Sequence, residues 1–173
     1  MKHTGINLQS AYIFKRKNTA IDEIYAKYAD MLYRLALTHS SSKEDAEDAV
    51  HDAFAAFLTA EPRFEDAEHE KAWFIRVTIN KCRDITRKNS VRVYTDLEEI
   101  GEIAAKEEKE SPAVTALRRL HEKYRAVISL HYLEGYSVEE TAHILNLSLS
   151  AVKMRLSRGR LKLREIIEKE ELL

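Results

Sequence analysis

Residues 137–160, SVEETAHILNLSLSAVKMRLSRGR, predict a helix-turn-helix. Ser137 and Glu140 have the spacing of a capping box, so the first helix is expected to begin there. Asn146 stands where the tight turn needs a left-handed residue, and Ser148 can cap the second helix. These signals together predict a short helix, a tight turn and a longer second helix.

The second helix of this unit has an apolar face and a basic face. At helical periodicity the apolar stripe contains Val152, Leu156, Gly159, Leu163 and Ile166. The opposite face carries Ser150, Met154, Ser157 and Arg158, with Lys153 and Arg155 beside it. From Lys153 to Arg164 there are six basic residues and no acidic one, in a chain of net charge −1. Such local segregation favours binding to DNA phosphates over a merely solvated helix face.

The composition favours an all-α chain. Hydrophobic residues make up 45% of the 173 residues, and there are only 4 glycines and 2 prolines. The single cysteine, Cys82, cannot form an internal disulfide and fits a reducing compartment. No apolar run is long enough for a membrane span, and residues 1–18 lack the features of a secretory signal.

Periodicity and charge divide the chain into two helical domains. Helical spacing of apolar residues predicts helices over 19–37, from Ser42 to before Pro62, over 71–89 and over 112–133. Residues 96–110 contain seven acids and few large apolar side chains, which is typical of a flexible linker. We therefore expect an N-terminal extension (1–18), a first domain (19–90), an acidic linker (91–111) and a second domain (112–173).

The helix after Ser42 carries acidic residues on one side. Asp45, Asp48 and Asp52 follow each other at three- and four-residue steps, opposite Val50 and Phe57. This side is either a solvated helix face or a docking face for a basic partner. Nothing nearby supplies a pocket that would raise a carboxyl pKa, which argues against catalytic acids.

The helix around Trp73 combines aromatic, basic and amide groups on one side. Phe74, Ile75, Thr78, Ile79, Cys82 and Ile85 form its apolar side. The other side carries Arg76, Asn80, Arg83 and Arg87, with Trp73, Lys81 and Lys88 within reach. Trp can stack on an exposed base while Arg and Lys hold phosphates, a combination suited to single-stranded nucleic acid. The alternative is that Trp73 packs under a neighbouring helix.

These segments support a resemblance to a known family. Residues 45–52 (DAEDAVHD) and 72–84 (AWFIRVTINKCRD) resemble conserved region 2 of bacterial sigma factors. The segment from Leu120 through Arg125 to Leu163 resembles region 4. Both regions in this order, separated by a short linker, resemble the extracytoplasmic-function (ECF) group of the sigma-70 family.

The resemblance implies a promoter-specificity subunit of RNA polymerase, which is not an enzyme in itself. It implies core RNA polymerase and promoter DNA as partners, with no cofactor, metal or small-molecule substrate. By similarity, the acidic face would dock the clamp helices of the largest polymerase subunit through Asp45, Asp48, His51 and Asp52. The linker would thread toward the active-site cleft.

The resemblance also assigns the DNA contacts. The Trp73 helix would open the minus-ten element and hold it as a single strand, and the loop from Phe64 to His69 would capture a flipped base. The implied minus-ten residues are Phe64, His69, Trp73, Arg76, Asn80, Lys81, Arg83, Arg87 and Lys88. The second domain would bind the polymerase flap and the duplex minus-35 element. The implied minus-35 residues are Ser150, Lys153, Met154, Arg155, Ser157 and Arg158.

Several positions depart from the family pattern. His51 replaces the usual glutamine and Ala49 the usual leucine, so the polymerase contact is expected to be tuned differently. Gly159 replaces a common alanine, at a cost of about 1 kcal/mol of helix stability. Met154 is poorly suited to form hydrogen bonds with base edges, so it is expected to pack on a thymine methyl group.

The family also predicts regulation and location. An anti-sigma factor is expected as a partner, and the protein is expected in the cytoplasm, where that partner can hold it at the membrane. Two alternatives remain: a helix-turn-helix transcriptional regulator, or a helical adaptor that does not bind polymerase. An enzyme or metal protein built on the histidines is disfavoured, because they are scattered without paired ligand spacing.

Overall fold

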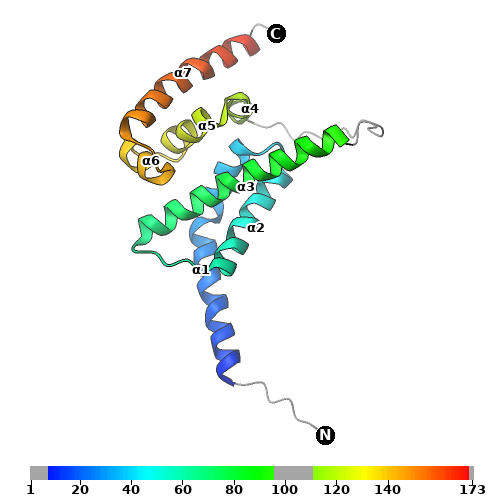
Figure 1. Cartoon of the computed structure of the whole chain (residues 1–173), viewed down its shortest axis with the longest axis vertical. Coiled ribbons are helices and arrows are strands. Elements are labelled where there is room, and N and C mark those ends of the chain that lie inside the picture. The colour runs from blue at the N-terminus through cyan, green and yellow to red at the C-terminus, as the bar shows by residue number, and fades with distance from the viewer. Residues whose placement is uncertain (1–7, 96–110, 172–173) are drawn as a thin grey trace.

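The computed structural model describes residues 8–95 and 111–171, and within these ranges the chain forms helices and no strand (Figure 1). The N-terminal half contains α1 (Leu8–His39), α2 (Lys43–Ala60) and α3 (Ala67–Thr95). The C-terminal half contains α4 (Pro112–Arg119), α5 (Glu122–Ile128), the π-helical turn η1 (Ser129–Leu133), α6 (Val138–Leu145) and α7 (Leu149–Glu171). The all-α prediction is confirmed. The predicted linker residues 96–110 lie outside the described residues.

Local capping signals position the first three helices. The Ser42 hydroxyl accepts a hydrogen bond from the Asp45 backbone N–H at 3.0 Å and starts α2. Glu61 ends that helix in the left-handed conformation, with φ of 43°. The Asp66 carboxylate then accepts from the His69 N–H at 2.7 Å and starts α3. The three helices enclose a core in which Leu32 and Phe74 are fully buried.

The predicted helix-turn-helix is confirmed in detail. Ser137 and Glu140 form both hydrogen bonds of the capping box, at 3.0 and 2.8 Å. Hydrogen bonding to the Ser137 backbone N–H, and then to the Ser137 side chain, lowers the pKa of the Glu140 carboxyl. Asn146 is left-handed with φ of 52°, and the Ser148 hydroxyl accepts from the Ala151 N–H at 3.2 Å. The apolar stripe of α7 faces inward as expected, with Val152, Leu156 and Gly159 buried and Leu163 and Ile166 half-buried.

Three of the predicted helices differ from those in the structure. The first helix begins at Leu8 instead of residue 19, and α3 extends beyond the expected 71–89 at both ends. The single helix expected over 112–133 is broken, because Leu120 adopts an extended conformation with ψ of 139°. The His121 ring then accepts from the Lys123 N–H and begins α5. Apolar spacing continues across this break, so periodicity alone could not place it.

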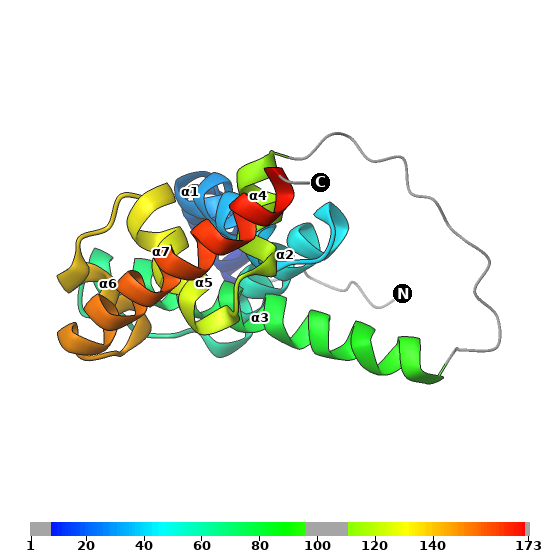
Figure 2. The ribbon, with the colours of Figure 1, turned by 90° about the horizontal axis from the view of Figure 1, so that it is seen from above.

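The two halves of the chain pack against each other. α6 contacts α3, and α4 and α5 contact α1 (Figure 2). Ala126, Leu130 and Ile144 from the C-terminal half join the core cluster of the N-terminal half. A second core cluster lies within the C-terminal half and includes Leu117, Val127 and Val152.

Gly159 of α7 lies close to α5, which leads to a stability prediction. A Cβ atom at this position would lie 3.1 Å from Ile128 Cγ1 and 3.3 Å from Tyr124 Cβ. Gly159→Val is therefore expected to lower the free energy of unfolding by about 2 kcal/mol through overpacking. Gly159→Ala is expected to change it by less than about 1 kcal/mol, since helix propensity offsets mild crowding. Urea unfolding of both variants measures this, and a valine variant as stable as the wild type would contradict the close approach.

Candidate nucleic-acid interface

An aromatic cluster, defined here as Phe57, Phe64, Trp73 and Phe74, lies where the loop before α3 meets α2 and α3. The Trp73 ring meets the other three rings edge-on, at centroid distances of 5.1 to 6.2 Å. Phe64 stacks parallel to Phe57 at 6.3 Å and meets His69 edge-on at 5.6 Å. Trp73 and Phe64 are both half-buried. The cluster therefore fixes an aromatic ring from the loop beside one from α3, with part of each still exposed.

The polar side of α3 is held in several contacts. Arg76 is half-buried and donates to the Ile144 carbonyl at 3.2 Å. Arg83 donates to the Asn80 side-chain oxygen at 3.1 Å and lies 3.6 Å from the Glu122 carboxylate. Arg87 pairs with Asp84 at 3.3 Å, and Lys81 lies 3.5 Å from Asp52. The structure thus brings the predicted residues of α3 onto one side of the helix, and two of them contact the C-terminal half.

The outer face of α7 is presented to solvent. The residues predicted there that are exposed are Ser150, Lys153, Met154, Ser157 and Arg158. Arg155 differs from them, because it is half-buried and turned toward the N-terminal half. An exposed basic helix face suits the major groove of duplex DNA, which is wide enough to admit an α-helix.

The predicted polymerase-binding residues of α2 divide into two groups. Asp45 accepts hydrogen bonds from the Asn89 amide at 3.1 and 3.4 Å, and Asp52 lies near Lys81, so both of these contact α3. Asp48 and His51 are exposed. His51 also lines a groove of about 330 Å³ between α1 and α2, together with Tyr25, Ala29, Asp30, Tyr33, Glu47 and Val50.

The α1 side of this groove was not anticipated from the sequence. Tyr25 of α1 is 44% exposed, with its ring 4.8 Å from that of Phe54. Asp30 belongs to no motif. Only the pairing of α1 with α2 brings these residues beside His51, so no local signal in the sequence could have found them.

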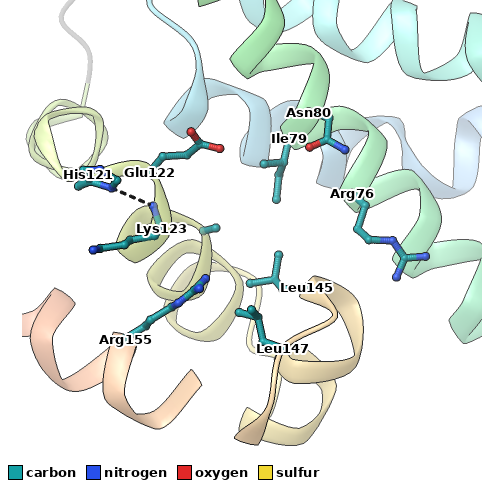
Figure 3. Close-up of a pocket in the computed structure, with 10 residues that line it drawn as sticks. Arg76, Ile79, Asn80, His121, Glu122, Lys123, Leu145, Leu147 and Arg155 are labelled. Carbon is teal, nitrogen blue, oxygen red and sulfur yellow. Dashed lines mark hydrogen bonds between the residues drawn. The ribbon is translucent and has the colours of Figure 1, made fainter. Parts of the chain in front are cut away.

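A cavity of about 410 Å³ lies between part of α3 and the C-terminal half (Figure 3). Arg76, Ile79 and Asn80 line it from α3. Its other walls are formed by His121, Glu122, Lys123, Ala126, Leu145, Leu147 and Arg155. The predicted minus-ten residues Arg76 and Asn80 therefore share one cavity with the predicted minus-35 residue Arg155.

His39 is buried where the halves meet and makes stability depend on pH. Burial, and then the positive charge of Arg125, lower the pKa of His39 to about 3. The unfolded chain takes up this proton near pH 6.5 and the folded chain does not, so stability is full above pH 6.5 and falls as pH decreases toward 3. Between pH 7 and 5 the loss from this group is expected to be about 2 kcal/mol. Urea unfolding of the wild type and His39→Leu at both pH values measures it, and equal losses in the two proteins would contradict it.

Three further properties hold for the described residues. No helix among them is long and apolar enough to cross a membrane. No group of three or more His, Cys, Asp or Glu side chains among them could hold a metal ion. Burial raises the pKa of the Cys82 thiol to about 11, so this cysteine stays protonated in the core.

Comparison with known families identifies both halves. The family model for sigma-70 region 2 matches residues 24–92, and the model for sigma-70 region 4 matches residues 112–163. The RNA polymerase sigma factor CnrH of Cupriavidus metallidurans is 30% identical over 166 residues, covering 86% of this chain and 87% of that protein. The chain is an ECF sigma factor of the sigma-70 family. The ECF RNA polymerase sigma factor SigW of Bacillus subtilis is 29% identical over 169 residues, covering 87% of this chain and 90% of that protein.

Solved structures of sigma factors share this arrangement of helices. The sigma factor RpoE of Bartonella quintana, in complex with the anti-sigma factor NepR, superposes with a TM-score of 0.67 at 25% identity. That similarity covers 85% of this sigma factor and 96% of the RpoE chain. CnrH in complex with the cytosolic domain of CnrY gives a TM-score of 0.64 at 26% identity, over 88% of this chain and 90% of that chain. Both similarities extend over regions 2 and 4 together.

Proposed function

We propose that this sigma factor directs core RNA polymerase to promoters by reading two separate DNA elements. In this proposal α7 reads the minus-35 element as duplex, and α3 with its preceding loop holds the minus-ten element as a single strand. The observation that carries the proposal is that one chain presents two basic surfaces of different character. The α7 face is basic and exposed, whereas α3 combines basic side chains with a partly exposed aromatic cluster. Aromatic rings suit unpaired bases, and a basic helix face suits a groove.

The minus-ten contacts are proposed to centre on Trp73 and Phe64. Their half-buried rings leave a surface on which a flipped base can stack, and Asn80 offers an exposed amide. The basic side chains Arg76, Lys81, Arg83, Arg87 and Lys88 would hold phosphates along the strand, with His69 supporting Phe64. Stacking and pocket contacts offset the cost of unstacking, so opening needs no ATP.

The polymerase contact is proposed to use the exposed part of the α2 face. Asp48 and His51 are accessible there, beside the groove that α1 and α2 form. Asp45 and Asp52 are placed in the same face by their contacts with α3. The proposed role is that of an initiation factor and not of an enzyme, with no cofactor and with a cytoplasmic location.

An anti-sigma factor is proposed as a further partner. This rests on the similarity to RpoE, which was solved with an anti-sigma factor, and to CnrH, which was solved with the cytosolic domain of CnrY. Coexpression with the neighbouring reading frame tests it. A stable complex between the two products is the expected result, and the absence of any complex counts against this partner.

Run-off transcription tests the proposed function. Core RNA polymerase, this protein and a fragment library of the host genome should yield discrete transcripts from promoters that share two sequence blocks. The Trp73→Ala, Asn80→Ala double variant is expected to reduce them at least about 30-fold, because each lost stacking or base contact is worth about 1–3 kcal/mol.

Two controls keep this test specific. Asn80 is exposed, so Asn80→Ala alone separates a DNA contact from a folding defect. Glu165→Gln on the exposed far end of α7 should transcribe like the wild type. Absence of transcripts together with absence of binding to core polymerase, while another initiation factor works in the same assay, would contradict the proposal.

A further inference from the structure

A cavity of about 380 Å³ lies within the C-terminal half, between the segment that joins α4 to α5 and the C-terminal part of α7. α4 contacts α7 in this half of the chain (Figure 2). The lining residues on α7 include Lys162, Ile166 and Lys169, whose four- and three-residue steps place them on one side of the helix. None of the lining residues belongs to the proposed DNA-reading surfaces. The volume falls in the range of small-molecule pockets, about 300–1,000 Å³.

The walls of this cavity are strongly basic. They include one carboxylate, that of Glu165, and four basic side chains, those of Arg119, Lys123, Lys162 and Lys169. Positive charge is therefore concentrated here in a chain whose net charge is −1. A concave surface lined by charges of one sign focuses the electrostatic potential and attracts ligands of the opposite sign. The cavity is thus suited to an anion.

The single carboxylate leaves Lys162 available to such an anion. The Lys162 amine lies 3.0 Å from a Glu165 carboxylate oxygen, one helical turn away on α7. Both side chains are more than half exposed, at 58% and 56%. Exposed ion pairs of this kind contribute little free energy, so a more highly charged phosphate group can replace Glu165 as the partner of Lys162.

His121 adds a neutral hydrogen-bond donor to the basic walls. Its Nδ1 accepts a hydrogen bond from the Lys123 backbone N–H at 3.3 Å, the contact dashed in Figure 3. A neutral imidazole that accepts at Nδ1 carries its proton at Nε2. The Nε2–H group is therefore a donor that suits a phosphate oxygen.

An apolar and aromatic surface lies beside these polar groups. It is formed by Leu120, which is buried, and by Tyr124 and Ile166, which are half-buried. The Tyr124 ring meets the His121 ring edge-on at 6.2 Å, and the Lys123 amine lies 5.0 Å from the Tyr124 ring centroid. Aromatic side chains provide surfaces for packing a planar base. The cavity thus combines groups for phosphates with a surface for a base.

We propose that this cavity binds a nucleotide that carries two or three phosphates. The phosphates lie against Lys123, Lys162 and Lys169, and the base packs beside Tyr124. This site goes beyond the proposed promoter-reading role and does not depend on it. A nucleotide bound here joins the start of α5 to the C-terminal part of α7, so it stabilises the folded C-terminal half by mass action.

Calorimetric titration of the whole chain with ATP tests the site. The titration is made without Mg²⁺, so that the phosphates keep their full charge. We expect one site with a Kd on the order of 100 μM, since the lysines are exposed and each contributes modestly. Adenosine should not bind measurably, and inorganic tripolyphosphate should bind about tenfold more weakly than ATP, because it lacks the base.

Two charge reversals on α7 form a matched pair. Lys162→Glu should weaken ATP binding about tenfold or more, because it turns an attraction to the phosphates into a repulsion. Arg164→Glu makes the same charge change two residues further along the helix, at an exposed position that does not line the cavity. It should leave the Kd within about twofold of the wild type. Lys169→Glu is a second variant in the cavity and should also weaken binding, with helical circular dichroism retained in all three proteins.

Three results would overturn the nucleotide site. The first is no heat of binding with ATP up to about 5 mM, 50-fold above the expected Kd. The second is equal weakening by Lys162→Glu and Arg164→Glu, or equal binding of tripolyphosphate and ATP, which would indicate general attraction of anions. The third is displacement of ATP by a short DNA duplex whose own binding Lys162→Glu weakens as much, which would assign these cations to DNA phosphates.

Discussion

Phe74→Ala is expected to lower the free energy of unfolding by about 3–5 kcal/mol, the range for deleting a fully buried aromatic side chain. The Phe74 side chain is fully buried, and four rings surround it. Their centroids lie 5.1 to 5.3 Å from that of Phe74, and the rings belong to Tyr28, Phe54, Phe57 and Trp73. The phenyl ring therefore joins α1, α2 and α3, and alanine would leave a cavity that three helices cannot close by moving one side chain.

This substitution should also move Trp73. The chain has one tryptophan, so its fluorescence reports on the aromatic cluster alone. We expect a red-shifted emission in Phe74→Ala, because water gains access to the indole once the ring beneath it is gone. Phe74→Leu is the matched control, since it fills most of the volume and should lose only about 1–2 kcal/mol. Urea unfolding measures the free energy of unfolding of both variants. A decrease below about 1 kcal/mol in Phe74→Ala would show that packing around Phe74 contributes little to the stability of the core.

Packing in this core also orients Trp73, a side chain that the proposed function uses. Trp73 is held by side chains from α2, from the preceding loop and from α3 itself, so its orientation is a product of packing. The sequence predicted an aromatic residue on the polar side of this helix, with packing under a neighbour as the alternative. The structure combines the two, because Trp73 is half-buried: one part of the ring packs and another part faces outward.

Features encoded by neighbouring residues were predictable. The capping box of Ser137 and Glu140, the left-handed Asn146 and the cap at Ser148 depend on side chains within three residues of the backbone they bind. The two faces of α7 follow from helical periodicity in the same way. Features that join distant segments were not predictable, and the ion pair between Arg34 and Glu134 is the clearest case: the two residues are 100 positions apart and neither belongs to a motif. The break at Leu120 was missed because apolar spacing continues through it.

Arg125→Met is expected to lower the free energy of unfolding by about 2–4 kcal/mol, because it removes the group that stabilises this break. The Arg125 guanidinium donates to the carbonyls of Arg118 and Leu120 at the end of α4. Carbonyl groups at a helix end have no partner within the helix, and leaving them buried without a donor is costly. Arg125→Lys should lose less, since it keeps the charge but cannot reach several carbonyls at once.

Arg125→Met should also change how the free energy of unfolding depends on pH. Burial is the main reason that the pKa of His39 is low, and the charge of Arg125 adds to it. Without that charge the folded protein can protonate His39 at a higher pH than the wild type can. The stability difference between Arg125→Met and the wild type is therefore expected to be smaller at pH 4 than at pH 7. Urea unfolding at the two pH values measures this coupling. A difference that is the same at both pH values, in proteins that retain their helical circular dichroism, would mean that Arg125 and His39 do not interact. The break between α4 and α5 would then be stabilised independently of the buried histidine at the junction of the two halves.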